Sequence, residues 1–222
     1  MCGPGSTVEA VVFDLDGVIL DSELLWDEAR RELARAHGRP WPPEATRAMM
    51  GMSAPEWSRF LHDEAGVPDE PDAINRDVVE RMLEAYRHEL PLLPGAKEAV
   101  RRTAAAFPLA LASSSNREVF EEVLELAGLA DCFRATVSSE EVERGKPAPD
   151  VYLEACRRLG VEPARAAAVE DSHAGIASAK AAGMRVIAIP NPAYPPGDEA
   201  LAQADLVLAS LAEFTPEAIQ SA

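Results

Sequence analysis

A chain of 222 residues, 47% of them hydrophobic, is long enough to bury a sizeable core as one large domain or one and a half of ordinary size. Its formal net charge of −17 and pI near 4.6 repel nucleic-acid phosphates and anionic lipid headgroups, so neither nucleic acid nor membrane is an expected partner. Residues 1–6 lack the pattern of a secretory signal and no stretch approaches the roughly 20 apolar residues of a membrane span, so the expected location is cytoplasmic.

Short apolar runs alternate with helical patterns along most of the chain. The runs at residues 8–13, 109–112, 166–169 and 186–189 predict buried strands, with additional strands near 135–137 and 206–208. Helical patterns lie between them at residues 96–106, 117–127, 151–159 and 174–182. Strands that alternate with helices of this length predict an α/β fold built on a parallel sheet.

The stretch that follows the first strand has helical periodicity and no convincing strand. The apolar face of one predicted helix holds Leu25, Ala29, Leu33 and Ala36, and that of another holds Ile74, Val78, Met82 and Tyr86. Between them, Ser53 and Glu56 fit a capping box. These patterns predict an all-helical cap at residues 22–91, inserted into an α/β core formed by residues 1–21 and 92–222.

The cysteines indicate neither a disulfide framework nor a zinc site. Cys2, Cys132 and Cys156 lie far apart in the chain and in no paired spacing, so we expect three reduced thiols. The chain has only three lysines, so a lysine beside a motif is more informative than usual. Nothing such as a heptad repeat requires assembly, and the expected state is a monomer.

Polar side chains follow the predicted strands at the points where the strands end. Asp14 and Asp16 follow the first strand, the serines and asparagine of residues 113–116 follow the second, and Glu170 and Asp171 follow the strand at 166–169. Lys146 lies in a proline-braced loop that cannot be helical at that residue. Ligands of parallel α/β sheets collect at the carboxyl ends of the strands, so these side chains are predicted to converge on one cavity.

A cavity that gathers Asp14, Asp16 and Asp171 needs a cation. Like charges at about 4 Å repel by roughly 1 kcal/mol in water and several times more at an effective dielectric near 20. Oxygen ligands suit a hard ion, and Mg²⁺ keeps waters and recruits a substrate phosphate to complete its octahedron. The expected ligand is therefore a small-molecule phosphate ester, and the expected cofactor is Mg²⁺.

The positions of these residues suggest a role for each in phosphoryl transfer. Asp14, at the strand tip, would attack phosphorus, and Asp16, two residues on, would protonate the leaving oxygen and then deprotonate water. Ser113 would donate to a phosphoryl oxygen, and Lys146 would offset the accumulating charge. Residues 115 and 118, a serine and a glutamate, fit a second capping box, which would point a helix N-terminus at the anion.

Each motif taken alone has a simpler reading. The Asp14-Leu-Asp-Gly sequence could be an exposed turn, Lys146 a solvated lysine, and Glu170 with Asp171 a helix N-cap pair. The side chains of Trp26 and of Met49, Met50 and Met52 could face the substrate or could equally pack the interior of the cap. Only the four motifs in one order make the turn reading a poor one.

In that order, the motifs resemble those of the haloacid dehalogenase-like hydrolase superfamily. The matching segments are residues 13–22 (FDLDGVILDS), 112–115 (ASSS), 145–150 (GKPAPD) and 169–176 (VEDSHAGI). The resemblance covers nearly the whole chain and is strongest to the subfamily of β-phosphoglucomutase and the sugar-phosphate and hexitol-phosphate phosphatases, which have a helical cap. It implies a doubly wound, Rossmann-like sheet and a cap that closes over the substrate.

The resemblance also implies roles for individual residues. Asp14 would be the nucleophile and Asp16 the acid and base, and both would bind Mg²⁺ together with Asp171, Asp16 through its backbone carbonyl. Glu170 would join this metal site as a supporting neighbour. The phosphate contacts would be Ser113, Ser114 and Lys146.

Members of the superfamily differ in reaction, and particular residues favour one branch. Dehalogenases lack the second aspartate of the first motif, whereas Asp16 is present; phosphonate-cleaving members need a cap lysine, and residues 22–90 contain none. Mutases hold a histidine and an arginine where an ungapped comparison places Trp26 and Ala54. The favoured function is a Mg²⁺-dependent phosphatase acting through an aspartyl phosphate on a sugar, polyol or similar phosphate. The alternatives are a phosphosugar mutase and a non-catalytic phospho-ligand sensor, which would lack the nucleophile or the lysine.

Overall fold

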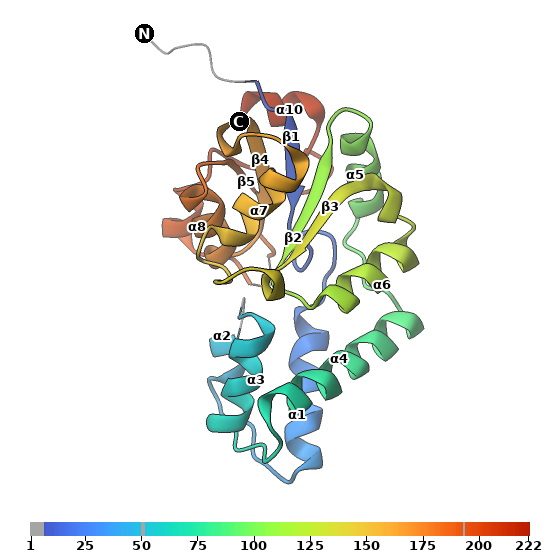
Figure 1. The fold of residues 1–222 in the computed structure, drawn as a ribbon, viewed down its shortest axis with the longest axis vertical. Coiled ribbons are helices and arrows are strands. Elements are labelled where there is room, and N and C mark those ends of the chain that lie inside the picture. Colours follow the sequence, from blue (N-terminus) through green and yellow to red (C-terminus); the bar gives the residue numbers. More distant parts are fainter. Residues whose placement is uncertain (1–6, 50–51, 193) are drawn as a thin grey trace.

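In the computed structural model, which describes residues 7–49, 52–192 and 194–222, six parallel strands form one sheet (Figure 1). The order in space is β3-β2-β1-β4-β5-β6. The strands are β1 (Ala10–Phe13), β2 (Leu109–Ser113), β3 (Phe133–Ser138), β4 (Ala166–Glu170), β5 (Arg185–Ala188) and β6 (Leu206–Val207). The chain adds strands on one side of β1 and then, from β4, on the other. The strand order therefore reverses between β1 and β4, where open α/β sheets leave a crevice for ligands.

Helices cover both faces of this sheet. They are α5 (Ala96–Ala104), α6 (Arg117–Ala127), α7 (Asp150–Leu159), α8 (His173–Ala181), α9 (Asp198–Leu201) and α10 (Pro216–Ser221), with short 3-10 turns η1 (Ala130–Cys132), η2 (Ser139–Glu141) and η3 (Pro163–Arg165). Alternate residues of β1 enter two separate buried clusters, Val11 and Phe13 on one face and Ala10 and Val12 on the other. The expected doubly wound α/β fold is confirmed.

The predicted strands and helices of the core differ from the observed ones mainly at their ends. The helix predicted at 117–127 has those limits, whereas α5 ends two residues before the predicted 106. The first strand begins at Ala10 and not at residue 8. The two residues before it are bonded elsewhere, since Glu9 N–H donates to Arg165 O and Val8 N–H donates to the side chain of Gln220.

Four helices lie together at the carboxyl end of the sheet (Figure 1): α1 (Glu23–Ala36), α2 (Ala45–Met49), α3 (Ala54–Asp63) and α4 (Pro71–His88). We call them the cap. The capping box of Ser53 and Glu56 begins α3, as predicted. All four apolar positions predicted for the second cap helix are buried on α4. Since no strand occurs among the described residues of this stretch, the four helices bury their apolar faces largely against one another.

The face predicted for the first cap helix is right at Ala29 and Leu33 and wrong at its two ends. Ala36 is exposed and Leu25 is only half-buried. The buried face of α1 consists of Trp26, Ala29, Arg30, Leu33 and Ala34. Arg30 lies in the middle of this face and interrupts its apolar pattern.

Two adjacent chain segments connect the cap to the sheet. Leu20 forms an antiparallel bridge with Leu92, Asp21 N–H donates to Pro91 O at 2.8 Å, and Leu93 N–H donates to Ile19 O at 2.9 Å. The chain segments that enter and leave the cap are thus hydrogen-bonded to each other. That residues 22–91 act as a separate domain stays a prediction. No helix among the described residues has the length and apolar character needed to cross a membrane.

Candidate active site

The site begins where β1 and β4 end side by side. Phe13 pairs with Val169, and Asp14 N–H donates to Val169 O at 3.0 Å, so the residues that follow the two strands are level. One carboxylate oxygen from each of Asp14, Glu170 and Asp171 lies within 4.8 Å of the other two. The sheet therefore brings together Asp14 and Asp171, as predicted, with Glu170 as the third member of the cluster.

Lys146 provides the positive charge of this cluster. Its ammonium lies 2.9 Å from Asp14 Oδ1 and 2.6 Å from Glu170 Oε1, and the residue is only 6% exposed. Burial lowers the pKa of Lys146, but the carboxylates of Asp14 and Glu170 outweigh burial and hold that pKa above its ordinary value. Lys146 is thus a fixed cation beside Asp14.

The carboxylate of Glu170 is fully occupied by protein donors. Oε1 accepts from Lys146 and, at 2.6 Å, from the hydroxyl of Tyr152; Oε2 accepts from Asp171 N–H, Ser172 N–H and the Ser172 hydroxyl. The residue has no exposed surface. This arrangement suits a residue that positions Lys146 better than it suits the metal ligand proposed from sequence.

Asp171 and Asp14 retain the unmet charge that a cation would satisfy. Asp171 Oδ1 is buried without a hydrogen-bond partner in the described chain. Burial, then Glu170 and Asp14, raise the pKa of Asp171 well above its usual range. Burial raises the pKa of Asp14 to about 7, since Lys146 only partly opposes burial and Glu170 adds to it. An orphaned carboxylate oxygen in an oxygen-only cluster fits a hard divalent cation such as Mg²⁺.

Gly17 leaves the space that Asp171 occupies. A Cβ at this position would lie 1.8 Å from Asp171 Oδ2, and the glycine has a φ of +80°. Both the contact and the backbone conformation require glycine here. The Asp-Leu-Asp-Gly sequence is therefore part of the acidic site and not an exposed turn.

Asp16 lies beside the cluster, and its carboxylate is held by three side chains. Oδ1 accepts from the Ser22 hydroxyl and from Trp26 Nε1 at 3.2 Å, and Oδ2 accepts from the Ser115 hydroxyl at 2.6 Å. Trp26 belongs to the cap and Ser115 to the core. Asp16 thus joins the two parts, and its carboxylate is not among the oxygens that group around a possible ion.

The loop after β2 approaches the same place, but not with the predicted capping box. The N-cap of α6 is Asn116, not Ser115, and the Ser115 hydroxyl bonds Asp16 instead of the helix. At the N-terminus of α6, Glu140 accepts from Arg117 N–H at 3.0 Å, so a carboxylate of the protein already uses one of the N–H groups predicted to face the anion. The hydroxyl of the fully buried Ser113 accepts from Ser115 N–H at 3.0 Å.

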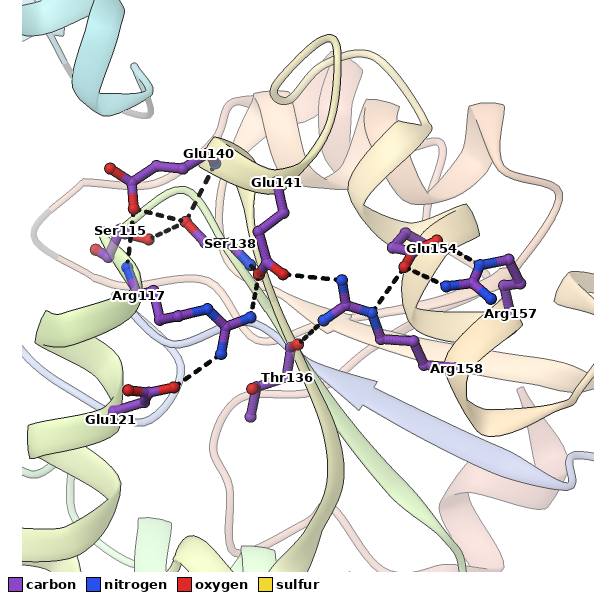
Figure 2. Close-up of polar contacts among 10 residues, drawn as sticks. All are labelled: Ser115, Arg117, Glu121, Thr136, Ser138, Glu140, Glu141, Glu154, Arg157 and Arg158. Carbon is purple, nitrogen blue, oxygen red and sulfur yellow. Dashed lines mark hydrogen bonds and ion pairs between the residues drawn. The ribbon is translucent and has the colours of Figure 1, made fainter.

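A polar network holds this loop from behind (Figure 2). The Ser138 hydroxyl donates to Ser115 O at 2.8 Å. Glu141 accepts from Ser138 N–H at 2.8 Å and from the guanidinium groups of Arg117 and Arg158, which lie on α6 and α7. Glu141 therefore connects α6 and α7 to the end of β3, where Ser138 bonds the loop.

Replacing Glu141 should have a small effect, since its partners are near solvent. We expect Glu141→Gln to lower stability by about 1 kcal/mol, a shift of roughly 2–4 °C in Tm, because two partly solvated ion pairs weaken. Thermal unfolding in low and high salt measures this, and the difference from wild type should shrink in high salt. The exposed neighbour Glu143, replaced by glutamine, is the control. A loss above about 3 kcal/mol would contradict a screened surface network.

A cavity of about 380 Å³ opens above the acidic cluster, within the size range of small-molecule sites. Its core side includes Asp14, Asp16, Ser114, Ser115, Lys146 and Asp171, and its cap side includes Trp26, Arg30, Arg47, Met49, Met52 and Trp57. Ser113 is not among the lining residues, so of the predicted phosphate contacts only Ser114 and Lys146 reach the cavity. Met50 falls outside the described residues.

Some residues of the site were not singled out from the sequence. Tyr152, which anchors Glu170, gave no signal, because nothing in a helical pattern shows which residue faces a strand end. Ser22 was part of the first motif without this role, and Trp26 was considered only as a residue that faces the substrate or packs the cap. Arg30 did have a signal, since it lies four residues after Trp26 on a face that is otherwise apolar.

Comparisons with known proteins identify the family of this chain. The family model described as haloacid dehalogenase-like hydrolase matches residues 8–183. Hexitol phosphatase B of Escherichia coli K12 is 34% identical over 93% of this chain and 94% of its own. CbbY of Rhodobacter sphaeroides, solved as a mutant in complex with xylulose-(1,5)bisphosphate, has a TM-score of 0.83 and 30% identity over 93% of this chain and 96% of its own.

A β-phosphoglucomutase of Clostridium difficile shares the fold alone, with a TM-score of 0.82 and 24% identity over 96% of each chain. The match to the family model spans most of the sequence and includes all four motifs. This chain belongs to the haloacid dehalogenase-like hydrolase family.

Proposed function

We propose that this phosphoric monoester hydrolase removes the phosphoryl group from a small sugar or polyol phosphate, with Asp14 as nucleophile and Mg²⁺ as cofactor. The observation that carries the proposal is the position of Asp14, whose carboxylate lies 2.9 Å from the Lys146 ammonium, among buried carboxylates, at the floor of a small cavity. A nucleophile, a fixed cation and a place for a metal thus face the same small space.

The first step would form a bond between a carboxylate oxygen of Asp14 and phosphorus while the bond from phosphorus to the leaving oxygen breaks. Lys146 is positioned to offset charge on both the carboxylate and the phosphoryl group. It stays protonated, since its pKa is raised. Glu170 would keep the ammonium in place through its own bond of 2.6 Å.

Asp16 would supply the proton that the leaving oxygen needs. In the second step it would take a proton from water, which attacks phosphorus, releases inorganic phosphate and returns the Asp14 carboxylate. Its bonds to Trp26 and Ser115 mean that the cap and the phosphate loop both orient this proton donor. Because Oδ1 also accepts from the Ser22 hydroxyl, loss of the Trp26 bond alone would leave both oxygens bonded, and one hydroxyl would have to rotate away for Asp16 to face the substrate.

The residues that would hold Mg²⁺ are the carboxylates of Asp14 and Asp171 and the backbone carbonyl of Asp16. The unpartnered oxygen of Asp171 supports this choice, while the five donors on Glu170 leave it the supporting role. When bound, Mg²⁺ would neutralise the carboxylates and the phosphoryl oxygens. The protein alone holds these groups close, at a cost of roughly 3 kcal/mol for each like-charged pair at an effective dielectric near 20.

The choice of phosphatase over mutase depends on the cap. Mutase relatives hold a histidine and an arginine where Trp26 and Ala54 stand here. Trp26 lines the cavity, and its indole N–H donates to Asp16. The side chain of Ala54 has no group that could bind a second phosphate. Hexitol phosphatase B, at 34% identity, supports a sugar or polyol phosphate as the substrate.

The experiment measures phosphate release from sugar, polyol and glycolytic phosphates, with Mg²⁺ and with a chelator. We expect turnover of at least one hexose or hexitol phosphate, and a loss of about 100-fold or more when the metal is removed. Turnover that persists in the chelator would contradict the requirement for Mg²⁺. Conversion of a hexose 1-phosphate to its 6-isomer faster than hydrolysis would favour the mutase function. A protein that binds these esters without turnover would be the sensor.

A further inference from the structure

The cap side of the cavity holds a second polar centre, away from the acidic cluster. Arg30, on α1, lines the cavity and is only 8% exposed. Its guanidinium carbon lies 5.2 Å from the ring centroid of Trp26 and 5.0 Å from that of Trp57. Arg30 lies one helical turn, about 5.4 Å, beyond the tryptophan that bonds Asp16. Figure 1 shows α1 running away from the sheet, and Arg30 follows Trp26 along this helix.

The hydrogen-bonding groups of Arg30 are unused in the part of the chain that the structure describes. Nε is buried without a partner, and no described carboxylate forms an ion pair with this guanidinium. Its two ring contacts support the flat faces of the group and leave the N–H edge unbonded. A buried charged group with unmet donors is costly unless something else accepts from it. An arginine in a cavity wall with this deficit indicates ligand oxygens as the missing acceptors.

The neighbouring Glu23 limits which kind of ligand oxygen can bind to Arg30. It lines the same cavity, and it is the carboxylate that most strongly counteracts the effect of burial on the pKa of Arg30. A hydroxyl can accept from Arg30 and donate to Glu23 at once, whereas a phosphate or ionised carboxylate can only accept. An anion there would also face repulsion from Glu23 and from Asp16, both of which raise the pKa of Arg30 against the effect of burial.

The charge of the whole cavity supports the same choice. Its lining has four carboxylates, Asp14, Asp16, Glu23 and Asp171, against the three full cations Arg30, Arg47 and Lys146. One divalent cation and one dianionic phosphate would leave this balance unchanged. The cavity therefore has no surplus positive charge for a second phosphate, while the apolar faces of two tryptophans suit the C–H surface of a polyol.

We infer that Arg30, supported by Trp26 and Trp57, is a specificity-determining residue that binds hydroxyl groups of the substrate at the end remote from Asp14. It thereby selects phosphate monoesters whose other end is uncharged and polyhydroxylated. The inference rests on the proposed function for the identity of the other end. It places the recognition of hydroxyls on α1, where no catalytic residue is found.

The test compares kcat/KM for a hexitol phosphate with that for phenyl phosphate, which has no hydroxyl chain. Arg30→Met keeps the length and the contact with the indoles but removes every donor. We expect the ratio of the two kcat/KM values to fall about 10- to 100-fold, because hydrogen bonds from a charged donor are lost. Arg30→Lys should give an intermediate ratio, since a single ammonium group replaces the several N–H donors of the guanidinium. Arg35→Met, an exposed change on the same helix, should leave the ratio at its wild-type value.

Three outcomes would overturn the inference. The ratio could stay constant while both values fall together, which would make Arg30 structural. Wild type could prefer a hexose bisphosphate to the monophosphate and lose that preference with Arg30, which would make the site an anion site. If Arg30→Met fails to fold, Arg30→Lys decides, and an unchanged ratio in that variant contradicts the role.

A binding measurement separates this inference from the proposed function. Calorimetry with hexitol phosphate and Mg²⁺ compares Asp14→Asn with the double variant Asp14→Asn/Arg30→Met, in which turnover plays no part. Weaker binding of about 10-fold or more by the double variant supports Arg30 even if the wild type proves inactive. Equal binding by the two variants, in a protein whose wild type hydrolyses the ester, would remove Arg30 and leave the proposed function intact.

Discussion

Asp14→Asn should reduce kcat for any phosphate ester by about 10⁴-fold or more, because an amide cannot form the acyl phosphate through which the proposed reaction passes. The substitution keeps the shape of the side chain and removes one charge from a crowded cluster. Burial raises the pKa of Asp14 to about 7, so its ionised form is less stable in the folded protein than in the unfolded chain. We therefore expect a folded variant whose Tm without metal is equal to or above that of wild type.

The sign of this stability effect depends on pH. A carboxyl whose pKa is raised on folding destabilises the protein as pH rises from its ordinary value near 3.8 to about 7. The asparagine variant should thus match wild type in acid and equal or exceed it above neutrality, with Lys146 still paired to Glu170. Added Mg²⁺ should raise the Tm of wild type more than that of the variant, since a ligand is missing.

Steady-state phosphate release and thermal unfolding are measured on the same preparations. Asp131→Asn, an exposed aspartate of the core, is the matched control and should change neither. Turnover by Asp14→Asn within 10-fold of wild type would remove Asp14 as nucleophile. A large fall in Tm would mean instead that the Lys146 pair outweighs the desolvation of the carboxylate.

The parts of this site that could be predicted from sequence are those fixed by strand ends. Asp14 and Asp171 each follow an apolar run, and parallel neighbours end at the same edge of a sheet. The approach of Lys146 required more, because its loop leaves no periodic signal, and only its place among ordered motifs indicated the site.

Side-chain partners were beyond this reasoning. Ser115 could equally be a helix N-cap or bond a carboxylate, and local spacing favoured the N-cap. In the fold, Glu140 of the turn η2 accepts from the N-terminus of α6, and Ser115 bonds Asp16. The face of α1 was misjudged because Arg30 interrupts the apolar pattern of the buried face. Two tryptophans, one of them 27 residues after Arg30, allow the guanidinium to be buried.

The second large effect is expected at Gly175, in the first turn of α8. A Cβ at this position would lie 1.8 Å from Glu170 Oε1 and 1.9 Å from its carboxyl carbon. Glu170 cannot simply move aside, because it is fully buried and bonded to Lys146, Tyr152 and the start of α8. One added methyl group must therefore displace either the helix or the carboxylate that holds Lys146.

We expect Gly175→Ala to lower the free energy of unfolding by about 3 kcal/mol or more, since it breaks a buried ion pair, even though alanine has the better helix propensity by about 1 kcal/mol. Activity should fall as well, because Lys146 loses one of its two partners. Chemical denaturation measures the stability, and Ala181→Ser, which adds one atom at an exposed position of the same helix, is the control.

A double-mutant cycle with Glu170→Ala identifies the cause. That substitution is itself destabilising, because it leaves Lys146 and Tyr152 without their shared acceptor. It also empties the space that a methyl group at residue 175 would enter, so adding Gly175→Ala in this background should cost nothing or restore up to about 1 kcal/mol through helix propensity. If the methyl group costs as much without the glutamate as with it, the close approach of Gly175 to Glu170 is not what makes glycine necessary, and the backbone of α8 is.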